Sequence, residues 1–328
     1  MGAITSLLTR SDNILGNAAA QHNAKKEAIL ELPSGIEKTG ESDNNCGELV
    51  WLITGAASLL ARSIIDHALA RGDKIIATGR HLDKLRDLPQ TESVKLLELD
   101  VTAGPSVLKS KMEEAVTLFG RVDVLVNNAG DSVKTILEEG GSQLLRKQYE
   151  TNVFGLLDVT NAILPHMRSR RSGTVVLIGS RTSWRSELST VGAYASSKAA
   201  VRVLGETLAA EIAPFSIRTL IVEPGDFLTH GTVTIPVYET NPISDYDEQR
   251  KLAKKRIENI DPKNDPVKGM RILVDVVRGE GKAKGKKWPL YLPLGPEAKD
   301  GIEAKVKVVQ DVLDEWGDII SDTRIDKS

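Results

Sequence analysis

Cysteine, histidine and long apolar runs are scarce in this sequence of 328 residues, and each scarcity excludes a class of protein. The single cysteine, Cys46, has no partner for an internal disulfide and no companions for a cysteine-rich metal site. The five histidines show neither the HxxxH nor the HExxH spacing of zinc enzymes, so we expect no metal. No run of about eighteen apolar residues is present, so we expect no transmembrane segment.

A surplus of basic residues is also lacking: 43 lysines and arginines stand against 45 aspartates and glutamates. Proteins that bind nucleic acids carry a basic excess or a basic stripe, so we expect no nucleic-acid partner. A hydrophobic fraction of 41% and a charged fraction of 27% are typical of a soluble globular chain. Together with the lone cysteine, these values predict a cytoplasmic protein.

The first part of the chain differs in composition from the rest. Residues 33–47 are polar and rich in glycine, serine, asparagine and glutamate, which is typical of a linker. We therefore predict a flexible N-terminal arm over 1–48 and one domain over 49–328. Residues 1–6, Met-Gly-Ala-Ile-Thr-Ser, match the N-myristoylation pattern, so membrane association through an acyl group is the alternative to a purely cytoplasmic location.

From residue 49 onward, short apolar runs alternate with helical patterns. Strands are predicted at 49–53, 74–78, 94–99, 122–126, 174–178, 217–222 and 290–292, and helices at 59–71, 106–119, 143–170, 193–213 and 298–316. This alternation predicts a single Rossmann-type α/β domain, with a doubly wound parallel sheet in a three-layer α/β/α arrangement. Ligands of such sheets bind beyond the carboxyl ends of the strands, so the segments after each strand carry the candidate site.

The turn after the first predicted strand has the position of a dinucleotide pyrophosphate site, between a strand and a helix N-terminus. It begins with Thr54 and Gly55, but Leu59 and Ala61 replace the second and third glycines that are usual in such loops. The turn on its own is therefore close to an ordinary strand–helix connection.

The segments after the next two strands concern the adenosine half of a dinucleotide. Arg80 follows the second strand, where an NAD site has a carboxylate and an NADP site has a cation for the 2′-phosphate. A solvated surface arginine is the alternative. Asp100 and Val101 follow the third strand and are placed to meet the adenine, although Asp100 is equally suited to cap the next turn.

Tyr194 and Lys198 lie four residues apart on a predicted helix, so their side chains are neighbours on one face. An ammonium beside a phenol stabilises the phenolate and lowers a pKa that is ordinarily about 10. The tyrosine then becomes a usable acid or base near neutral pH. Ser180 lies fourteen residues upstream, just past a predicted strand, where its hydroxyl can face the same space and polarise a carbonyl.

Taken together, these motifs resemble the short-chain dehydrogenase/reductase family over about residues 49–316. The matching pieces, in chain order, are Thr54-Gly55, Asn127-Asn128-Ala129-Gly130, Asn152, Ser180, the Tyr194/Lys198 pair and Pro224-Gly225. The resemblance implies a nicotinamide cofactor that carries a hydride, and a protein that positions it against a carbonyl carbon.

The resemblance also implies a role for each matched residue. Tyr194 is similar to the family's proton donor, Lys198 to the residue that lowers the tyrosine pKa and binds the nicotinamide ribose, and Ser180 to the hydroxyl that orients the substrate. Asn152 resembles the residue that holds a water in the proton relay. The implied cofactor-binding residues are Gly55, Ser58, Leu60, Arg80, Asp100, Val101, Asn128, Ala129, Gly130, Tyr194, Lys198, Phe227 and Thr229. Singly, Asn152 also suits a helix cap, Ser180 a strand-end turn and Thr229 a helix start.

A substrate loop is expected at about 226–265, where the regular pattern lapses. Its apolar side chains are Phe227, Val233, Ile235, Pro236, Val237 and Tyr238. With Trp184, which we expect to face the pocket, they predict a hydrophobic carbonyl or alcohol as the small-molecule substrate. A homodimer or homotetramer is expected because members of the family commonly form one.

The sequence thus predicts an NADP-dependent oxidoreductase that interconverts a hydrophobic ketone or aldehyde and a secondary alcohol, with secondary metabolism as one setting. One alternative keeps the fold but is an epimerase or dehydratase. Another is a non-catalytic binding protein that has lost its cofactor, which Leu59 suggests and the complete set of Ser180, Tyr194 and Lys198 opposes.

Overall fold

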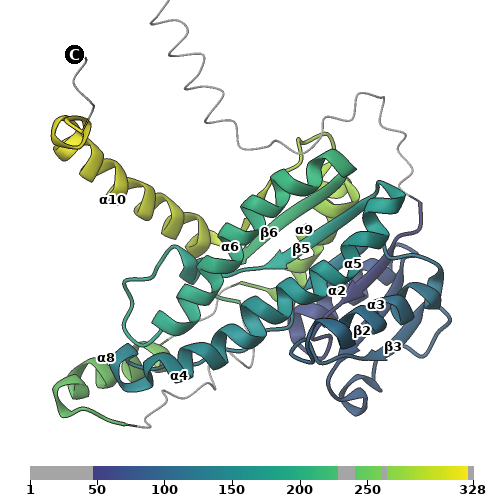
Figure 1. Cartoon of the computed structure of the whole chain (residues 1–328), viewed down its shortest axis with the longest axis horizontal. Helices are drawn as coiled ribbons and strands as arrows, with labels where there is room; N and C mark the ends of the chain where they lie inside the picture. The colour runs from purple at the N-terminus through teal and green to yellow at the C-terminus, as the bar shows by residue number, and fades with distance from the viewer. Residues whose placement is uncertain (1–46, 228–240, 260–263, 324–328) are drawn as a thin grey trace, which may run out of the picture.

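The computed structural model describes residues 47–227, 241–259 and 264–323, so the predicted arm lies almost entirely outside the described residues. Its centre is a parallel sheet of seven strands in the order β3-β2-β1-β4-β5-β6-β7 (Figure 1). The strands are β1 (Val50–Ile53), β2 (Lys74–Gly79), β3 (Val94–Glu98), β4 (Val124–Asn127), β5 (Gly173–Ile178), β6 (Ile217–Pro224) and β7 (Tyr291–Leu294). The order reverses between β1 and β4, which is where a doubly wound sheet binds ligands.

Helices cover both faces of the sheet, because its central strands are buried on both sides and mostly apolar. Helices α2 (Leu59–Leu69) and α9 (Pro266–Arg278) contact each other and share one apolar cluster with the sheet. Helices α3 (Pro105–Phe119), α5 (Leu156–Arg170) and α6 (Gly192–Ile212) supply the cluster on the other face. The predicted Rossmann-type, three-layer α/β/α fold is therefore confirmed.

The long helix predicted at 143–170 is wrong in one respect, because it is divided. Helix α4 (Leu137–Tyr149) leads into a π-helical turn over Glu150–Gly155, and α5 follows directly after it. Gly141, at φ 56°, adds a kink inside α4. A π-turn inserts an extra residue in a helix, and such turns are frequent at functional sites. Here the turn contains Asn152.

The expected loop at 226–265 contains a helix, α8 (Asp247–Glu258), and α9 after it was not predicted. Helix α8 lies beside α4 (Figure 1) and is tied to it by an ion pair between Arg250 and Glu139, whose side chains are only 8% and 1% exposed. Short 3₁₀ turns complete the described secondary structure; they are Leu82–Leu85, Arg181–Ser183, Ala213–Phe215, Ser244–Tyr246 and Gly281–Ala283.

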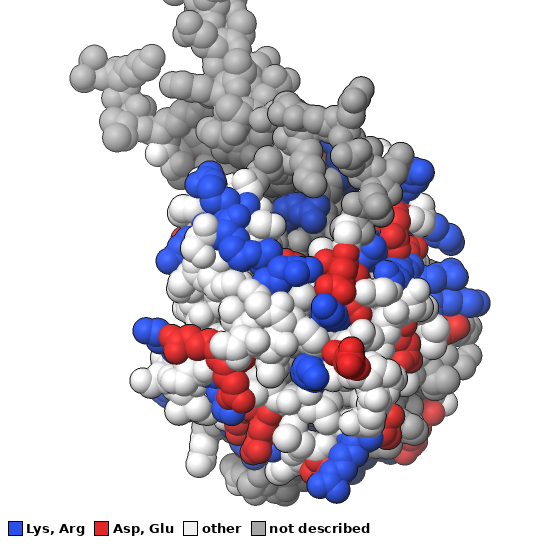
Figure 2. Space-filling model, turned by 90° about the vertical axis from the view of Figure 1, so that its right-hand side faces the viewer, with Lys and Arg blue, Asp and Glu red and all other residues white. Residues whose placement is uncertain are grey.

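The last helix, α10 (Pro296–Ser321), begins against the body of the protein and then extends away from it (Figure 1). Within the described ranges, neither α10 nor any other helix is long and apolar enough to cross a membrane. On the face shown in Figure 2, basic and acidic side chains lie next to one another. The described residues also contain no group of three His, Cys, Asp or Glu side chains able to hold a metal ion.

Candidate active site

The turn after β1 is fixed by the end of β4. Gly55 has a φ of +64°, and a Cβ there would lie 2.9 Å from the Cα of Ala129, so a larger residue would strain the turn and clash with the backbone. The Asn128 side-chain amide donates to the carbonyl oxygens of Thr54 at 2.9 Å and Gly55 at 3.0 Å. Thr54 Oγ1 accepts the backbone N–H groups of both Asn128 and Ala129 at 3.0 Å. These bonds hold the two strand ends together at the reversal point of the sheet.

Leu59 and Ala61, which replace the usual glycines of this turn, lie in the first turn of helix α2. Ser58 is the N-cap, and its hydroxyl accepts the N–H of Ala61 at 3.3 Å. Leu59 is the first helical residue and has no positive φ, so a leucine in place of the usual glycine causes no backbone strain here. Its side chain is 40% exposed, while Leu60 packs partly against the core and Ala61 is fully buried. The N-terminal amides of α2 are thus presented in an ordinary helix N-terminus.

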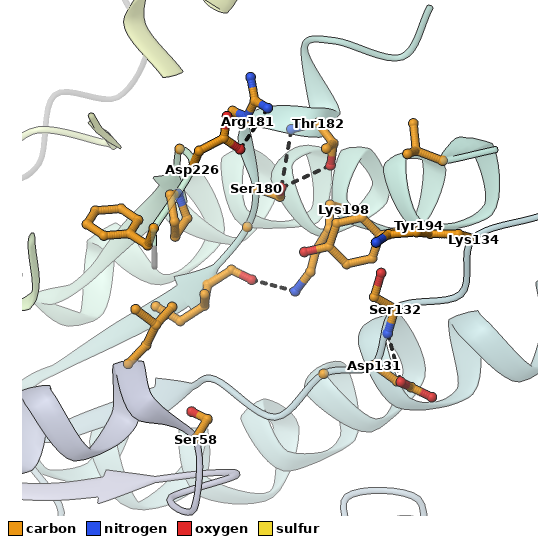
Figure 3. A pocket seen from close by; sticks show the side chains of 18 of the residues that line it. Ser58, Asp131, Ser132, Lys134, Ser180, Arg181, Thr182, Tyr194, Lys198 and Asp226 are labelled. Atoms are coloured by element: carbon orange, nitrogen blue, oxygen red, sulfur yellow. Dashed lines mark hydrogen bonds and ion pairs between the residues drawn. The ribbon is translucent and has the colours of Figure 1, made fainter. Parts of the chain in front are cut away.

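Tyr194 and Ser180 lie together beyond the ends of the strands, as expected (Figure 3). The expected lowering of the Tyr194 pKa by Lys198 is wrong for the structure as it stands, because burial raises that pKa and a hydrogen bond with Ser180, rather than Lys198, opposes the rise. Ser180 Oγ accepts the backbone N–H of Thr182 at 3.2 Å and its hydroxyl at 2.9 Å. With its acceptor capacity used in this way, Ser180 has its own hydrogen to donate toward Tyr194 or a substrate oxygen.

Lys198 is 4% exposed and lies next to Tyr194 on α6. Its Nζ is 5.9 Å from the centroid of the Tyr194 ring and donates to the carbonyl oxygen of Ile178 at 2.7 Å. Burial lowers the pKa of Lys198 to about 8. Burial therefore destabilises the Lys198 ammonium beside the phenol. An anion or dipole that enters the site changes the pKa of this lysine.

Asn152 is fully buried and joins the loop after β4 to α6. Its Oδ1 accepts the N–H of Asp131 at 2.8 Å, and its Nδ2 donates to the carbonyl of Asp131 at 2.9 Å and to Ser197 Oγ at 3.0 Å. A Cβ at Gly130 would lie 3.3 Å from Asn152 Oδ1 and 3.5 Å from Lys198 Nζ. Asn152 thus sets the path of the loop that passes Lys198.

A cavity of about 560 Å³ connects these groups (Figure 3). It runs from the start of α2, at Ser58, past the loop after β4 to the catalytic candidates on β5 and α6. The predicted site residues that line it are Ser58, Leu60, Asn128, Gly130, Ser180, Tyr194, Lys198 and Phe227. Gly55, Ala129 and Asn152 are not in the lining but hold lining residues in place. An elongated ligand that spans the reversal point of the sheet fits this shape.

Comparison with known proteins agrees with this geometry. A sequence model of the family described as short chain dehydrogenase matches residues 49–237, which is more than half of the chain. The chain belongs to the short-chain dehydrogenase/reductase family. This dehydrogenase is therefore an oxidoreductase, and enzymes of the family use NAD or NADP.

Relatives and solved structures support the assignment. Oxidoreductase BOA17 of Botryotinia fuckeliana (strain B05.10) is 29% identical over 280 residues, which cover 82% of this dehydrogenase and 97% of the relative. The uncharacterized oxidoreductase YusZ of Bacillus subtilis (strain 168) is 34% identical over 190 residues, which cover 55% of this chain but just under two thirds, 65%, of YusZ. A crystal structure of a short-chain dehydrogenase from Streptomyces avermitilis superposes with a TM-score of 0.75 at 34% identity, covering 85% of this chain and all of that one, 100%.

Besides Gly55 and Ala129, three more predicted cofactor residues of the dehydrogenase lie outside the cavity lining. Arg80 is exposed, directly after β2. The Asp100 carboxylate accepts the backbone N–H of Thr102 at 2.9 Å and its hydroxyl at 2.8 Å, so it caps a turn, which was the alternative interpretation. Val101 is 7% exposed and faces Gly155 of the π-turn, where a Cβ would lie 2.9 Å from Val101 Cγ2. These three residues lie on the β2–β3 side of the reversal point, as an adenosine site would.

The structure describes only some of the apolar side chains that we expected to line the substrate pocket. Phe227 lines the cavity and lies against Gly269 of α9, where a Cβ would come within 2.6 Å of the ring. Thr229 and the apolar positions at 233 and 235–238 lie outside the described residues. The expectation that Trp184 faces the pocket is wrong: its indole N–H donates to Glu223 at 2.6 Å, and Arg202 stacks 4.4 Å from its ring. Burial in that cluster raises the pKa of Glu223, although bonds from Trp184 and Ser183 oppose the rise.

The sequence interpretation missed three cations in the lining, namely Lys134, Arg181 and Arg256. Lys134 follows β4 and Arg181 follows β5, so both stand where ligands of the sheet are expected and a scan of those segments finds them. Arg256 lies on α8, in the segment predicted as a loop, and no signal in the sequence places it at the site.

Proposed function

We propose that this dehydrogenase transfers a hydride between NADP(H) and the carbonyl of a ketone or aldehyde, or the corresponding secondary alcohol. The observation that supports this best is the convergence of Ser180, Tyr194 and Lys198 at one end of a cavity whose other end is the N-terminus of α2. The family match and the oxidoreductase relatives support neither an epimerase or dehydratase nor a non-catalytic protein.

The residues present fit a dinucleotide. The start of α2 lines the cavity through Ala57, Ser58, Leu59 and Leu60, and a helix N-terminus suits the phosphates of a dinucleotide. Asn128 and Gly130 then lead to Lys198, which would hold the nicotinamide ribose. Bound NADPH supplies the hydride, and the chain supplies binding, orientation and the proton.

The proton step follows from the contacts of Tyr194. Because burial raises its pKa, the phenol is protonated at neutral pH and can donate to a carbonyl oxygen. Ser180 binds the same oxygen with its remaining hydrogen and orients it. In the oxidation direction the Lys198 ammonium stabilises the phenolate that accepts the proton from an alcohol. Asn152 positions the loop beside Lys198 through its two bonds with Asp131.

The preference for NADP rests on Arg80. It is exposed at the end of β2, the position at which a dinucleotide site contacts the 2′ position of the adenosine ribose. A guanidinium there pairs with a phosphate, whereas a carboxylate pairs with a hydroxyl. Arg80 therefore selects NADPH over NADH.

Replacing this arginine tests the cofactor assignment. Arg80→Glu should weaken NADPH binding by roughly ten- to a hundredfold, the value of one charge-assisted contact, and leave NADH binding unchanged or improved. Titration of cofactor fluorescence measures both constants. Arg86→Glu, an exposed change a few residues further along, is the matched control. Unchanged NADPH affinity in Arg80→Glu would remove the basis for an NADP preference.

For the expected homo-oligomer, we propose that α10 is the contact between copies. Beyond Gly301 this helix carries an exposed apolar stripe whose members recur at alternating steps of four and three residues. They are Ile302, which is half-buried, and the exposed Val306, Val309, Leu313, Trp316 and Ile320. That spacing is the seam of a two-helix coiled coil. A solvent-exposed seam of this length is stabilised when a second apolar helix covers it.

The charges of α10 favour a second copy in antiparallel orientation. From Val308 to Asp322 the helix has five acidic residues and no lysine or arginine, whereas residues 296–307 carry three acids and three lysines. Helices that lie on lipid surfaces are rich in basic residues on the polar face, so this acidic half is unsuited to an anionic membrane. An antiparallel pair sets each acidic half against the neutral half of its partner and keeps the two acidic halves apart.

A further inference from the structure

Three positively charged side chains from three separate elements meet in the lining of the cavity. Lys134 comes from the loop after β4, Arg181 from the turn after β5, and Arg256 from α8. Two acids also line the cavity: Asp226, whose carboxylate pairs with Arg181 at 2.8 Å, and Asp131, which accepts the N–H of Ser132 at 2.8 Å. With Lys198, the lining holds four cations and two anions, so it has an excess of positive charge.

These cations are close enough to repel one another. Burial lowers the pKa of Lys134, and the charge of Arg256 lowers it further. Burial likewise lowers the pKa of Arg256, with Arg181 as the additional cause. Like charges gathered in a partly buried place reduce stability, and an anion bound between them relieves that cost.

The cationic cluster lies on the substrate side of the cavity. Arg181 directly follows Ser180 in the chain, and Figure 3 shows Ser58, at the start of α2, across the opening from both of them. Lys134 is drawn beyond Tyr194, away from Ser58. Arg181 and Lys134 are therefore separated from Ser58 at the start of α2, where we propose that the cofactor phosphates bind.

Helix α8 holds Arg256 in place. Arg250 of the same helix is buried against Glu139 of α4, and the Arg256 guanidinium donates to the carbonyl oxygen of Ser189 at 2.9 Å. Apolar groups surround the cations in the lining; they are Leu188, Val191, Ile257, Ile178 and Phe227. The site thus combines a hydrophobic wall with fixed positive charge, which suits a ligand that has an apolar body and an acidic end.

We propose that the substrate of this dehydrogenase is an anionic carbonyl compound or alcohol, whose carboxylate or phosphate group is bound by Lys134 and Arg256. This inference rests on the proposed function, because it places the reacting carbonyl at Ser180 and Tyr194. It narrows the predicted hydrophobic substrate to one with an acidic group on the side of α8.

Calorimetry on the protein saturated with NADP⁺ tests the proposal without turnover. The probes are 4-acetylbenzoate and 4-acetylphenyl phosphate, each compared with the neutral 4-acetylbenzamide. We expect at least one anionic probe to bind about tenfold to a hundredfold more tightly than the amide, and the better of the two identifies the acidic group. In Lys134→Gln/Arg256→Gln this preference should fall to within about threefold. Lys251→Gln, which removes an exposed charge from α8, should keep it.

The outcomes separate this proposal from the proposed function. Equal binding of acid and amide by the wild type, a preference that survives Lys134→Gln/Arg256→Gln, or a double variant that loses NADPH affinity instead, would each overturn the anionic subsite. Arg256→Gln alone guards against misfolding, since it should reduce the preference while leaving the melting temperature close to that of Lys251→Gln. Failure of the oxidoreductase assignment appears separately, as absence of NADPH oxidation with every carbonyl, whatever the probes bind.

Discussion

Burial of Lys198 is the residue-scale feature on which the proposed proton chemistry depends most. The ammonium has one carbonyl partner, Ile178, and a phenol ring beside it, so its charge is only partly compensated. Tyr194 and Lys198 are neighbours because they lie four residues apart on α6, and this spacing can be read from the sequence. Residues four apart on one helix are a local relationship, and local relationships can be predicted from sequence.

The low pKa of Lys198 makes a prediction about stability. Because the folded-state pKa is about 8 and the ordinary value is 10.5, charging this lysine costs folding free energy at all pH values below about 8. The cost disappears as the pH rises toward 10.5. Lys198→Met lacks it, so its stability advantage over the wild type should shrink by about 3 kcal/mol between pH 8 and 10.5.

Urea unfolding of both proteins across this pH range provides the measurement, and the difference between them cancels the titration of all other groups. A difference that stays constant with pH would mean that the lysine is not desolvated in the folded protein. Lys251→Met, at an exposed position on α8, should give a constant difference and serves as the control.

At the scale of elements, α9 is a helix that could have been predicted from the sequence alone. Asp265 caps it by accepting the N–H of Val267 at 2.8 Å, Pro266 occupies its first position, and Gly279 ends it at φ 68°. These are local start and stop signals, and the apolar positions between them are spaced for one helix face. The predicted substrate loop nevertheless ends at about 265, and no element is predicted for 266–278.

Helix α8 could not have been predicted in the same way. Its sequence, DEQRKLAKKRIE, has hardly any apolar face, and its main anchor joins Arg250 to Glu139, which are 111 residues apart. The π-turn at Asn152 is similarly hidden, because the helical pattern continues through it. Contacts between distant segments decide both features, and so they also decide the cationic part of the site.

The anchor of α8 can be tested by one substitution. Glu139→Gln leaves Arg250 with the exposed Asp247 as its remaining carboxylate, and loss of the buried member of such a pair costs up to roughly 3–5 kcal/mol. We expect α8 to detach locally, so amide exchange over 247–258 should rise while exchange in the central strands stays slow. Mass spectrometry of deuterium uptake shows this directly, with Glu248→Gln as an exposed control. Unchanged exchange in α8 would show that other contacts hold it.

At the scale of the whole molecule, α10 extends away from the rest of the protein and exposes apolar side chains that no other described residue covers in a single copy of the chain. Leu313 and Trp316 are each 50% exposed in the middle of the apolar stripe. Leu313→Asp/Trp316→Asp should convert the expected oligomer to a monomer in light scattering at equal concentration, while the melting temperature changes little because the helix stands apart from the core. Asp318→Asn on the same helix should keep the wild-type mass. A monomeric wild type, or an unchanged mass in the double variant, would contradict the proposed contact.

The central claim is that Tyr194 gives the proton in an NADPH-dependent carbonyl reduction, and Tyr194→Phe tests it most directly. The change keeps the ring and removes only the hydroxyl that bonds with Ser180. Initial rates of NADPH oxidation are measured with a panel of neutral and acidic ketones and aldehydes, and Tyr149→Phe, outside the cavity lining, is the control. The account predicts turnover of at least one carbonyl by the wild type, a loss of about 10²–10⁴-fold in Tyr194→Phe, and NADPH affinity within a few-fold. Activity retained within a few-fold in Tyr194→Phe would contradict it.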